Sequence, residues 1–403
     1  MQLKIVCVLD LLSFASLRSE WDRLACESKS HSQSVTYDCG ELAAASVFAK
    51  GQKIYVVKIY DDRGLALLWP IAVQRKGFVR IARDLRGSSD EEYGGPLMRA
   101  SAGAEILRAS VELLTQIKAD VFEFAWVDDG SELHKVIEAF IQPWIVRHAP
   151  RRIRAAPGSE GMPRHAIKFA GFASWHDFMA TRPWTVHRNH DNQLRKLLKE
   201  QENVEFGCCT SADDAENILK WLFANKRSSA EAQGITTSYL MTLELRDSFI
   251  AMMRRADLGV PALVTYIKVA GKPIAASFSL VGPDVVEFFM TAYATEFSRY
   301  SAGILLLSYT AQWAHENGRD FDMRYLHVDD KAQWANHIAV CRRHAVFLTK
   351  DSVSASVTLA GLAGRKLYES GLRRLREPIR RAPPGAQVVL TGMRARQIER
   401  LGR

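Results

Sequence analysis

The stretch FSRYSAGILLLSYTAQWAHENGRDFDM, residues 297–323, places a short polar loop before an apolar helix and a strand. The loop contains Gly303, the helix is expected over 302–317, and Gly318 precedes a strand over 320–325. The segment just before it, VVEFFMTAY (285–293), has the composition of a buried strand. Free backbone amides that lead into a helix can hold a phosphate at the helix N-terminus. The order therefore predicts either an anion-binding loop or a plain turn before a core helix.

The segments on both sides of this stretch repeat one outline. In the second half, strands are expected at 261–269, 273–282 and 285–293, with short turns at 270–272 and 282–284. In the first half, strands are expected at 53–60, 65–73 and 79–85, with a hairpin turn at 61–64. A helix near 102–117 and a strand at 121–127 then follow, and another helix and a strand around Trp144 complete this half. This pattern predicts a mixed α/β (α+β) fold made of two similar domains, although no residue-level repeat is evident.

The segment RAAPGSEGMPR (154–164) has the Pro/Gly/Ser content of a linker. It divides the chain into a domain over 1–155, a domain over 156–350 and a tail over 351–403. The second domain is expected to begin with a strand at 165–171 and a helix over 174–201 that Pro183 interrupts. A strand near 204–210 and helices at 211–227 and 238–256 are expected before the second meander.

Composition and charge exclude several classes of protein. A chain of 403 residues with 47% hydrophobic and 25% charged residues is typical of a two-domain globular protein. No apolar run of about 18 residues occurs, which argues against a membrane span. The six cysteines form no CxxC pair and no zinc spacing, so a reducing, cytoplasmic compartment is expected. From residue 342 onward, 14 Lys and Arg face 4 Asp and Glu, so the formal charge of +9 belongs to the tail. A near-neutral body argues against a nucleic-acid partner.

Several segments together resemble a known family. They are SWHDFM (174–179), VHRNHDNQLRKLLKE (186–200), GKPIAASFSL (271–280), FFMTAYATEFSRYSAGILLLSYTAQWAHENG (288–318) and RDFDM (319–323). With SDEEYGGPL (89–97), they are similar to the CelD-like, cellulose-biosynthesis type acetyltransferases of the GNAT superfamily, which are related to FemABX proteins. The resemblance implies two tandem GNAT-like acyltransferase domains. It also implies acyl transfer from acetyl-CoA or another acyl-CoA to an amine, without a metal.

On this resemblance, the loop after 285–293 is the cofactor loop. Arg299, Ser301, Ala302, Gly303 and Ile304 would hold the pyrophosphate of the acyl-CoA. Backbone amides near Met290 to Ala292 would stabilise the oxyanion that forms during transfer. Tyr293, at the end of that strand, could donate a proton to the leaving thiolate, or it could be a packed strand aromatic.

The aspartate of the strand 320–325 is the expected catalytic group. Asp322 matches the family's aspartate and would position or deprotonate the amine; alternatively it is an N-cap or pairs with Arg319 or Arg324. Further along, Lys331 and Trp334 match the family pattern. Lys331 could bind a substrate phosphate or carboxylate, or be a solvated side chain, and Trp334 could contact the acceptor.

Two residues depart from the family pattern. Leu326 stands where a glycine is expected, which removes backbone freedom. Asp330 stands where a tyrosine is expected, which removes a phenol that could contact ligand. These departures predict a different acceptor or a weak activity.

Other candidate acceptor-binding residues lie on a loop and a basic helix. Glu92 and Tyr93 lie in SDEEYGGPL, a loop that faces the acceptor groove in related proteins. Arg188, with Arg195, lies on the basic helix and could approach a phosphate of cofactor or acceptor, or remain solvated. His187 and His190 are three residues apart, a spacing that could hold a metal, but exposed helical histidines are the simpler interpretation.

The basic tail is expected to form an amphipathic helix over 356–381. Such a helix can lie on an anionic membrane surface, pack on the body, or bind a phosphate-rich regulator such as cyclic di-GMP. The whole sequence predicts an N-acyltransferase that is either cytoplasmic or peripheral on the inner membrane. Its acceptor would be an amino sugar or a lipid- or nucleotide-linked glycan precursor in exopolysaccharide or cell-envelope synthesis. The alternatives are a non-catalytic GNAT-like binding protein, which senses a nucleotide or scaffolds a membrane synthase, and a FemX-like transferase that uses aminoacyl-tRNA.

Overall fold

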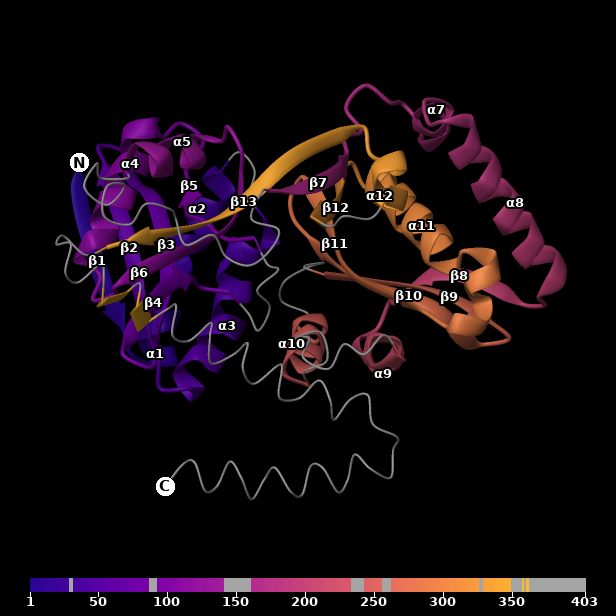
Figure 1. Cartoon of the computed structure of the whole chain (residues 1–403), viewed down its shortest axis with the longest axis horizontal. Coiled ribbons are helices and arrows are strands. Elements are labelled where there is room, and N and C mark those ends of the chain that lie inside the picture. The colour runs from indigo at the N-terminus through magenta and orange to yellow at the C-terminus, as the bar shows by residue number, and fades with distance from the viewer. Residues whose placement is uncertain are drawn as a thin grey trace, which may run out of the picture.

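The computed structural model describes residues 1–28, 32–86, 93–140, 161–232, 243–255, 262–325, 329–348, 357–358 and 360–361. Among these residues, the strands of both halves join in one continuous sheet. The strand order is β1-β2-β3-β4-β6-β13-β7-β12-β11-β10-β9-β8, with β5 paired to β3. Figure 1 shows two lobes, with β13 running from one to the other.

The first half is a four-stranded antiparallel meander followed by a parallel strand. Its strands are β1 (Gln2–Val8), β2 (Lys53–Asp61), β3 (Gly64–Lys76), β4 (Val79–Asp84), β5 (Leu97–Met98) and β6 (Val121–Asp128). Its helices are α1 (Leu11–Ala15), α2 (Arg18–Glu27), η1 (Gln33–Val35), α3 (Tyr37–Ala49), α4 (Ala104–Leu113), η2 (Leu114–Gln116) and α5 (Glu132–Phe140). Strands β4 and β6 pair in parallel, from Ile81–Val121 to Arg83–Glu123.

The second half repeats this topology. Its strands are β7 (Met162–Ile167), β8 (Val204–Cys208), β9 (Ala262–Val269), β10 (Lys272–Val281), β11 (Val285–Tyr293), β12 (Asp320–Tyr325) and β13 (His337–Phe347). Its helices are α7 (Trp175–Ala180), α8 (Trp184–Glu200), α9 (Ala212–Ala232), α10 (Leu243–Met253), η5 (Thr295–Tyr300), α11 (Ala302–Glu316) and α12 (Asp329–Trp334). Strands β8 to β11 form the meander, and β11 pairs in parallel with β12. The expectation of a mixed α/β fold made of two similar domains is therefore confirmed.

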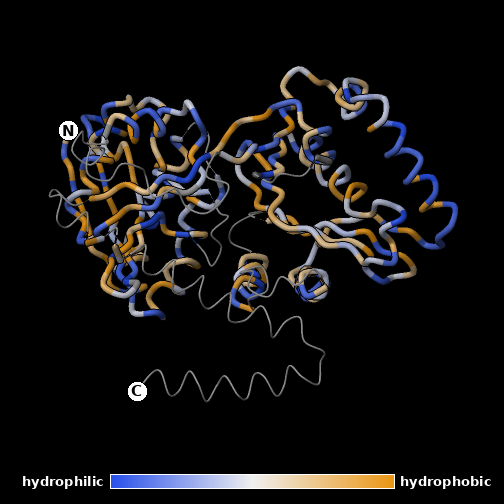
Figure 2. The backbone as a smooth tube through the Cα atoms, viewed as in Figure 1, coloured by the Kyte–Doolittle hydropathy of each residue, from blue (hydrophilic) through white to orange (hydrophobic). Residues whose placement is uncertain are grey.

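Helices cover both faces of the second sheet, as the alternation of apolar residues requires. Phe249 of α10 stacks on Phe278 of β10, with ring centroids 3.7 Å apart, in a core that α9 also covers. On the other face, α8 and α11 pack over β9 and β10, with Leu306 and Leu197 fully buried. Figure 2 shows that the outer side of α8 is largely hydrophilic.

Strand β13 joins the two halves. Residues His337 to Cys341 pair with β7, and residues Cys341 to Phe347 pair with β6. The sequence analysis missed this strand, because its centre, Arg342 to His344, carries three polar side chains that break the apolar alternation. It also missed α3, and it placed β7 at 165–171, whereas β7 begins at Met162.

The other expected elements lie within a few residues of their predicted bounds, including the interruption at Pro183 between α7 and α8. The strand expected near Trp144, most of the linker and most of the basic tail lie outside the described residues. Within those residues, no helix is both long and apolar enough to cross a membrane.

Candidate functional site

Strands β11 and β12 separate shortly after they begin. They pair only from Val285–Asp320 to Glu287–Asp322. Beyond these residues, β11 continues to Tyr293 bonded to β10, while β12 pairs with β7. The two strands therefore diverge, and the free edge of β11 leads toward the loop before α11.

The free side of β11 carries backbone groups that face away from β10. A bulge makes Phe289 the extra residue, because Met290 pairs with Phe278 and Phe288 pairs with Ser279. Farther along, the carbonyl of Thr291 accepts a hydrogen bond from Lys226 Nζ of α9 at 3.1 Å. Because the N–H and C=O of one strand residue point the same way in an antiparallel ladder, the Thr291 amide also faces the free side. It lies within the predicted oxyanion segment, Met290 to Ala292.

The N-terminus of α11 leaves two backbone amides available. Ser301 is in the left-handed conformation (φ 52°), and its carbonyl accepts from the amides of Ile304 and Leu305 at 2.8 and 3.1 Å. Within the described residues, the amides of Ala302 and Gly303 have no hydrogen-bond acceptor. The first turn of α11 contains no acidic residue. An anion placed here would meet two donors and the positive end of the helix dipole.

Gly303 lies close to the ring of Tyr293. A Cβ on Gly303 would lie 3.1 Å from the Tyr293 ring, whose residue is 47% exposed. The ring of Tyr293 and the helix N-terminus thus form one surface at the end of β11. Since two free amides lie at this helix N-terminus, its first turn has no acidic residue, and Gly303 adds no side chain, these residues fit the pyrophosphate of an acyl-CoA.

The other predicted cofactor residue, Arg299, is already engaged. Its guanidinium pairs with Glu200 of α8 at 3.2 Å and donates to the hydroxyl of Tyr300. That hydroxyl also donates to Glu200 and accepts from Gln201. Arg299 therefore fixes η5 against the C-terminal end of α8, next to the cradle.

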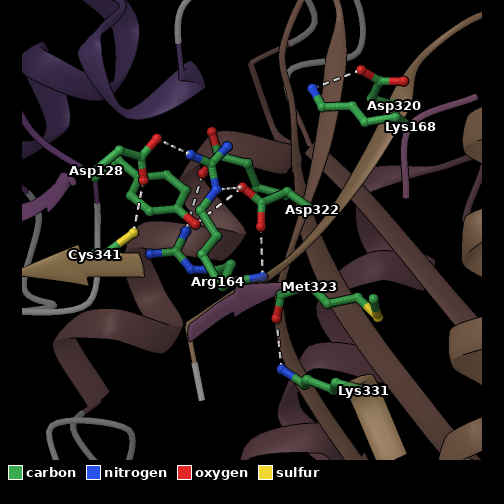
Figure 3. A network of polar contacts seen from close by, with 11 residues as sticks. Asp128, Arg164, Lys168, Asp320, Asp322, Met323, Lys331 and Cys341 are labelled. Carbon is green, nitrogen blue, oxygen red and sulfur yellow. Dashed lines mark hydrogen bonds and ion pairs between the residues drawn. The ribbon is translucent and has the colours of Figure 1, made fainter. Parts of the chain in front are cut away.

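Asp322 lies in a buried polar network between the two halves (Figure 3). Its Oδ2 accepts from Arg164 Nε at 2.8 Å and from the Tyr93 hydroxyl at 3.0 Å. Its Oδ1 accepts from the backbone N–H of Arg324 at 2.6 Å. Arg164 also donates to Asp128 at 2.7 Å, which links β7 to the end of β6. Asp322 is thus held by three donors, and its ion-pair partner is Arg164, rather than Arg319 or Arg324.

The network continues from Tyr93 to Glu287. Guanidinium carbons of Arg164 and Arg324 lie 5.1 and 4.6 Å from the Tyr93 ring centroid. Arg324, which is buried at φ 63°, also pairs with Glu287 at 3.0 Å. Burial and the Asp322 charge raise the pKa of Tyr93 well above its ordinary value. Burial also raises the pKa of Glu287, against the opposing charge of Arg324.

The remaining predicted residues have different surroundings. Lys331 donates to the Met323 carbonyl at 2.6 Å and ties α12 to β12. Trp334 is buried, with its ring against His190. Arg188 is exposed on α8. Glu92 and Leu326 lie outside the described residues, and the side chain of Asp330 is not described.

Some residues of the site gave no signal in the sequence. Lys226 lies within an ordinary amphipathic helix, and Arg164 lies at the end of the linker-like segment. Glu287 and Arg324 interrupt apolar strands, VVEFFM and FDMRY, and a charge at such a position is a usable sign of a buried partner.

One group of metal-ligand residues occurs elsewhere among the described residues. His134 and Glu138 of α5 lie with His344 of β13, and their ligand atoms are all within 4.8 Å of one another. The Gly130 amide donates to His134 Nδ1 at 3.2 Å, so a neutral His134 carries its proton on Nε2. That nitrogen lies 3.7 Å from Glu138 Oε1, which is too far for a hydrogen bond.

Comparison with known proteins agrees with this geometry. Residues 186–328 match the family model described as an acetyltransferase (GNAT) domain. The structure is similar to that of FemX, at a TM-score of 0.58 and 8% identity over 86% of this chain and 97% of that one. It is also similar to L-PGS from Bacillus licheniformis, at a TM-score of 0.50 and 11% identity over 86% and 96% of the two chains. No curated protein sequence matches. The fold is therefore of the GNAT acyltransferase type.

Proposed function

We propose that this chain is an N-acyltransferase that moves an acyl group from acyl-CoA to the amine of an amino sugar or a related glycan precursor. Exopolysaccharide or cell-envelope synthesis is the proposed setting. The observation that carries the proposal is the pair of available amides at Ala302 and Gly303, at the end of the β11 edge that has separated from β12. The GNAT family match covers this region of the chain.

The residues would divide the chemistry as follows. The α11 amides hold the pyrophosphate, and the acyl thioester lies along the free side of β11. The amine nitrogen forms a bond to the thioester carbon, and the Thr291 amide stabilises the resulting oxyanion. The C–S bond then breaks, Tyr293 is the candidate donor of a proton to the thiolate, and the attacking nitrogen releases its surplus proton to solvent. Lys226, held at the Thr291 carbonyl, places a positive charge beside this segment.

The polar network around Asp322 limits what this residue can do in the reaction. A carboxylate that accepts three hydrogen bonds has little remaining capacity to accept a proton from the amine. We therefore assign it a positioning role: it holds the Tyr93 hydroxyl and Arg324 at the opening between β11 and β12. Tyr93 is then the first-half residue placed to contact the acceptor.

The hydrogen bonds that Asp322 already accepts favour a second candidate function: a non-catalytic GNAT-like protein that binds a nucleotide such as cyclic di-GMP. A buried, fully bonded aspartate is compatible with a purely structural role. A FemX-like use of aminoacyl-tRNA stays a third candidate, which the near-neutral body disfavours.

Thermal unfolding with separate ligands separates these candidates. The full chain would be heated with acetyl-CoA, desulfo-CoA and cyclic di-GMP, each at about 100 times an expected micromolar Kd. Stabilisation of about 2.7 kcal/mol is expected from the two CoA compounds. A thiol-release assay with glucosamine and nucleotide-linked amino sugars then tests transfer. Stabilisation by cyclic di-GMP alone would contradict the acyltransferase proposal.

A further inference from the structure

A small cavity lies where the first half meets the second. Helix α3 and η1 of the first half contribute Ser34, Leu42 and Ser46 to its lining. From the second half, α10 contributes Phe249 and Met252, and β11 contributes Phe289. The cavity volume is about 40 Å³, which has room for about three water-sized groups.

The cavity is adjacent to the place where the acyl group is expected. Phe289 is the extra residue of the β11 bulge, two residues beyond the last residue that pairs with β12. The guanidinium carbon of Arg324, on β12, lies 4.4 Å from the centroid of the Phe289 ring. Phe289 therefore borders both the cavity and the separation of the two strands.

One polar side-chain atom that lines the cavity has no hydrogen-bond partner among the described residues. Ser34 is 4% exposed, and its Oγ has no hydrogen-bond partner among the described residues. Its backbone N–H is satisfied by Ser32 Oγ at 3.1 Å, so only the side chain remains. A buried hydroxyl without a partner is unfavourable, and a ligand oxygen in the cavity would satisfy it. From the second half, the one polar lining residue is Ser248, whose hydroxyl already donates to the Glu244 carbonyl at 2.8 Å.

We infer that this interdomain cavity receives the acyl group, and that the first half supplies one of its walls. It limits the acyl group to about four carbons and favours one with a hydroxyl near its end, which Ser34 would bind. The inference rests on the proposed function, because it assumes that acyl-CoA binds at α11. It adds a substrate class, short hydroxyacyl thioesters, and gives the first half a role in selecting the donor.

Calorimetric titration of the full chain with free CoA and four acyl-CoAs tests this inference. The acyl groups are acetyl, butyryl, 3-hydroxypropionyl and hexanoyl. Butyryl and 3-hydroxypropionyl have nearly the same shape and differ by a methyl against a hydroxyl. We expect butyryl-CoA to bind about tenfold more tightly than free CoA, 3-hydroxypropionyl-CoA to bind more tightly still, and hexanoyl-CoA to gain nothing over free CoA.

Two variants locate the effect. Ser46→Phe fills the cavity from a partly exposed position, so it should remove the gain from the acyl group and leave the Kd of free CoA unchanged. Ala45→Phe is the matched control, since Ala45 is the exposed neighbour on α3, and it should change neither. Ser34→Ala should lower the preference for 3-hydroxypropionyl over butyryl by about fivefold.

The possible results distinguish a failure of the cavity inference from a failure of the proposed acyltransferase function. If free CoA binds but the acyl preferences do not respond to Ser46→Phe, the cavity is not the acyl site and the inference fails alone. Tight binding of hexanoyl-CoA would also overturn it. If no CoA compound binds, the proposed function fails, and the inference fails with it.

Discussion

In the first half, β4 ends at Asp84, one residue beyond the last residue that pairs with β6, whereas in the second half β11 continues from Glu287 to Tyr293. The ends of the two strands also have different surroundings. Asp84 is buried and accepts from Trp69 Nε1 at 2.7 Å and from the Gly95 amide at 3.1 Å. The space beside the end of β4 is thus closed by the Asp84 side chain and the loop that carries Gly95. The end of β11, in contrast, keeps a free strand edge.

The helices that follow these strands, α4 and α11, also differ at their N-termini. Glu105 and Gly303 both occupy the second position of their helices, α4 and α11. The Glu105 carboxylate folds back over the N-terminus of α4, so closely that a Cβ on Gly103 would lie 2.3 Å from its Oε2. It brings a negative charge to the end of the helix where a phosphate would bind. At the second site that position is glycine, and the amides stay available.

The comparison indicates that the two halves share one topology but differ at the corresponding strand end and helix N-terminus. The loop whose Gly95 closes the first opening also carries Tyr93, which reaches Asp322 in the second half. The first half therefore serves as a support that places Tyr93 and the wall of the interdomain cavity. Variants that exchange or remove these differences test the comparison.

The largest effect is expected for Asp322→Ala. It leaves Arg164 and the Tyr93 hydroxyl with one acceptor fewer in a buried site, and such a loss costs about 3–5 kcal/mol. Urea unfolding measures the change in free energy. Glu123→Ala, at the corresponding position of β6, is the control, and a change below about 1 kcal/mol is expected because this side chain is only partly buried. Equal losses would show that the two positions are equivalent.

Gly303→Glu gives α11 the acidic residue that α4 has at its second position. The carboxylate at the helix N-terminus and its clash with Tyr293 should weaken CoA binding at least about 100-fold, or about 2.7 kcal/mol. Calorimetry with free CoA measures this change. The reverse change, Glu105→Gly, should leave CoA affinity as it is, because β4 offers no free edge beside α4. Retained affinity in Gly303→Glu would place the cofactor elsewhere.

Tyr93→Phe removes one donor to the buried carboxylate and should lower the free energy of unfolding by about 1.5–3 kcal/mol. Tyr293→Phe is a matched change at an exposed tyrosine, and it should leave stability unaltered while slowing thiol release. Thermal unfolding and the transfer assay report the two quantities separately. A stability loss in Tyr293→Phe but not in Tyr93→Phe would reverse the assignment of structural and chemical tyrosines.

The smallest effect concerns pH. Because the pKa of Glu287 is raised in the folded state, the folded chain binds more protons than the unfolded chain just above pH 4.5. This residue's contribution to stability is therefore present at low pH and is lost as the pH rises through that window, by at most about 1.4 kcal/mol per pH unit. Glu287→Gln should remove this slope from a series of urea midpoints. An unchanged slope would show that other groups set the pH dependence.

Most of the fold could be predicted from local sequence, because the strands and helices of both halves have clear apolar periodicity and glycine-rich turns. The position of the loop before α11 could be predicted for the same reason, since Gly303 lies between a strand and a helix. The network could not be predicted, because Tyr93, Arg164 and Asp322 are far apart in the chain and meet only through β13. Neither the role of Lys226 nor the interdomain cavity has a local pattern.

The most direct test is a crystal structure of the full chain with CoA bound. The account predicts that the pyrophosphate accepts hydrogen bonds from the amides of Ala302 and Gly303, and that the pantetheine arm runs along β11 toward Thr291. A pyrophosphate at the N-terminus of α4, or a CoA bound away from β11, would contradict it.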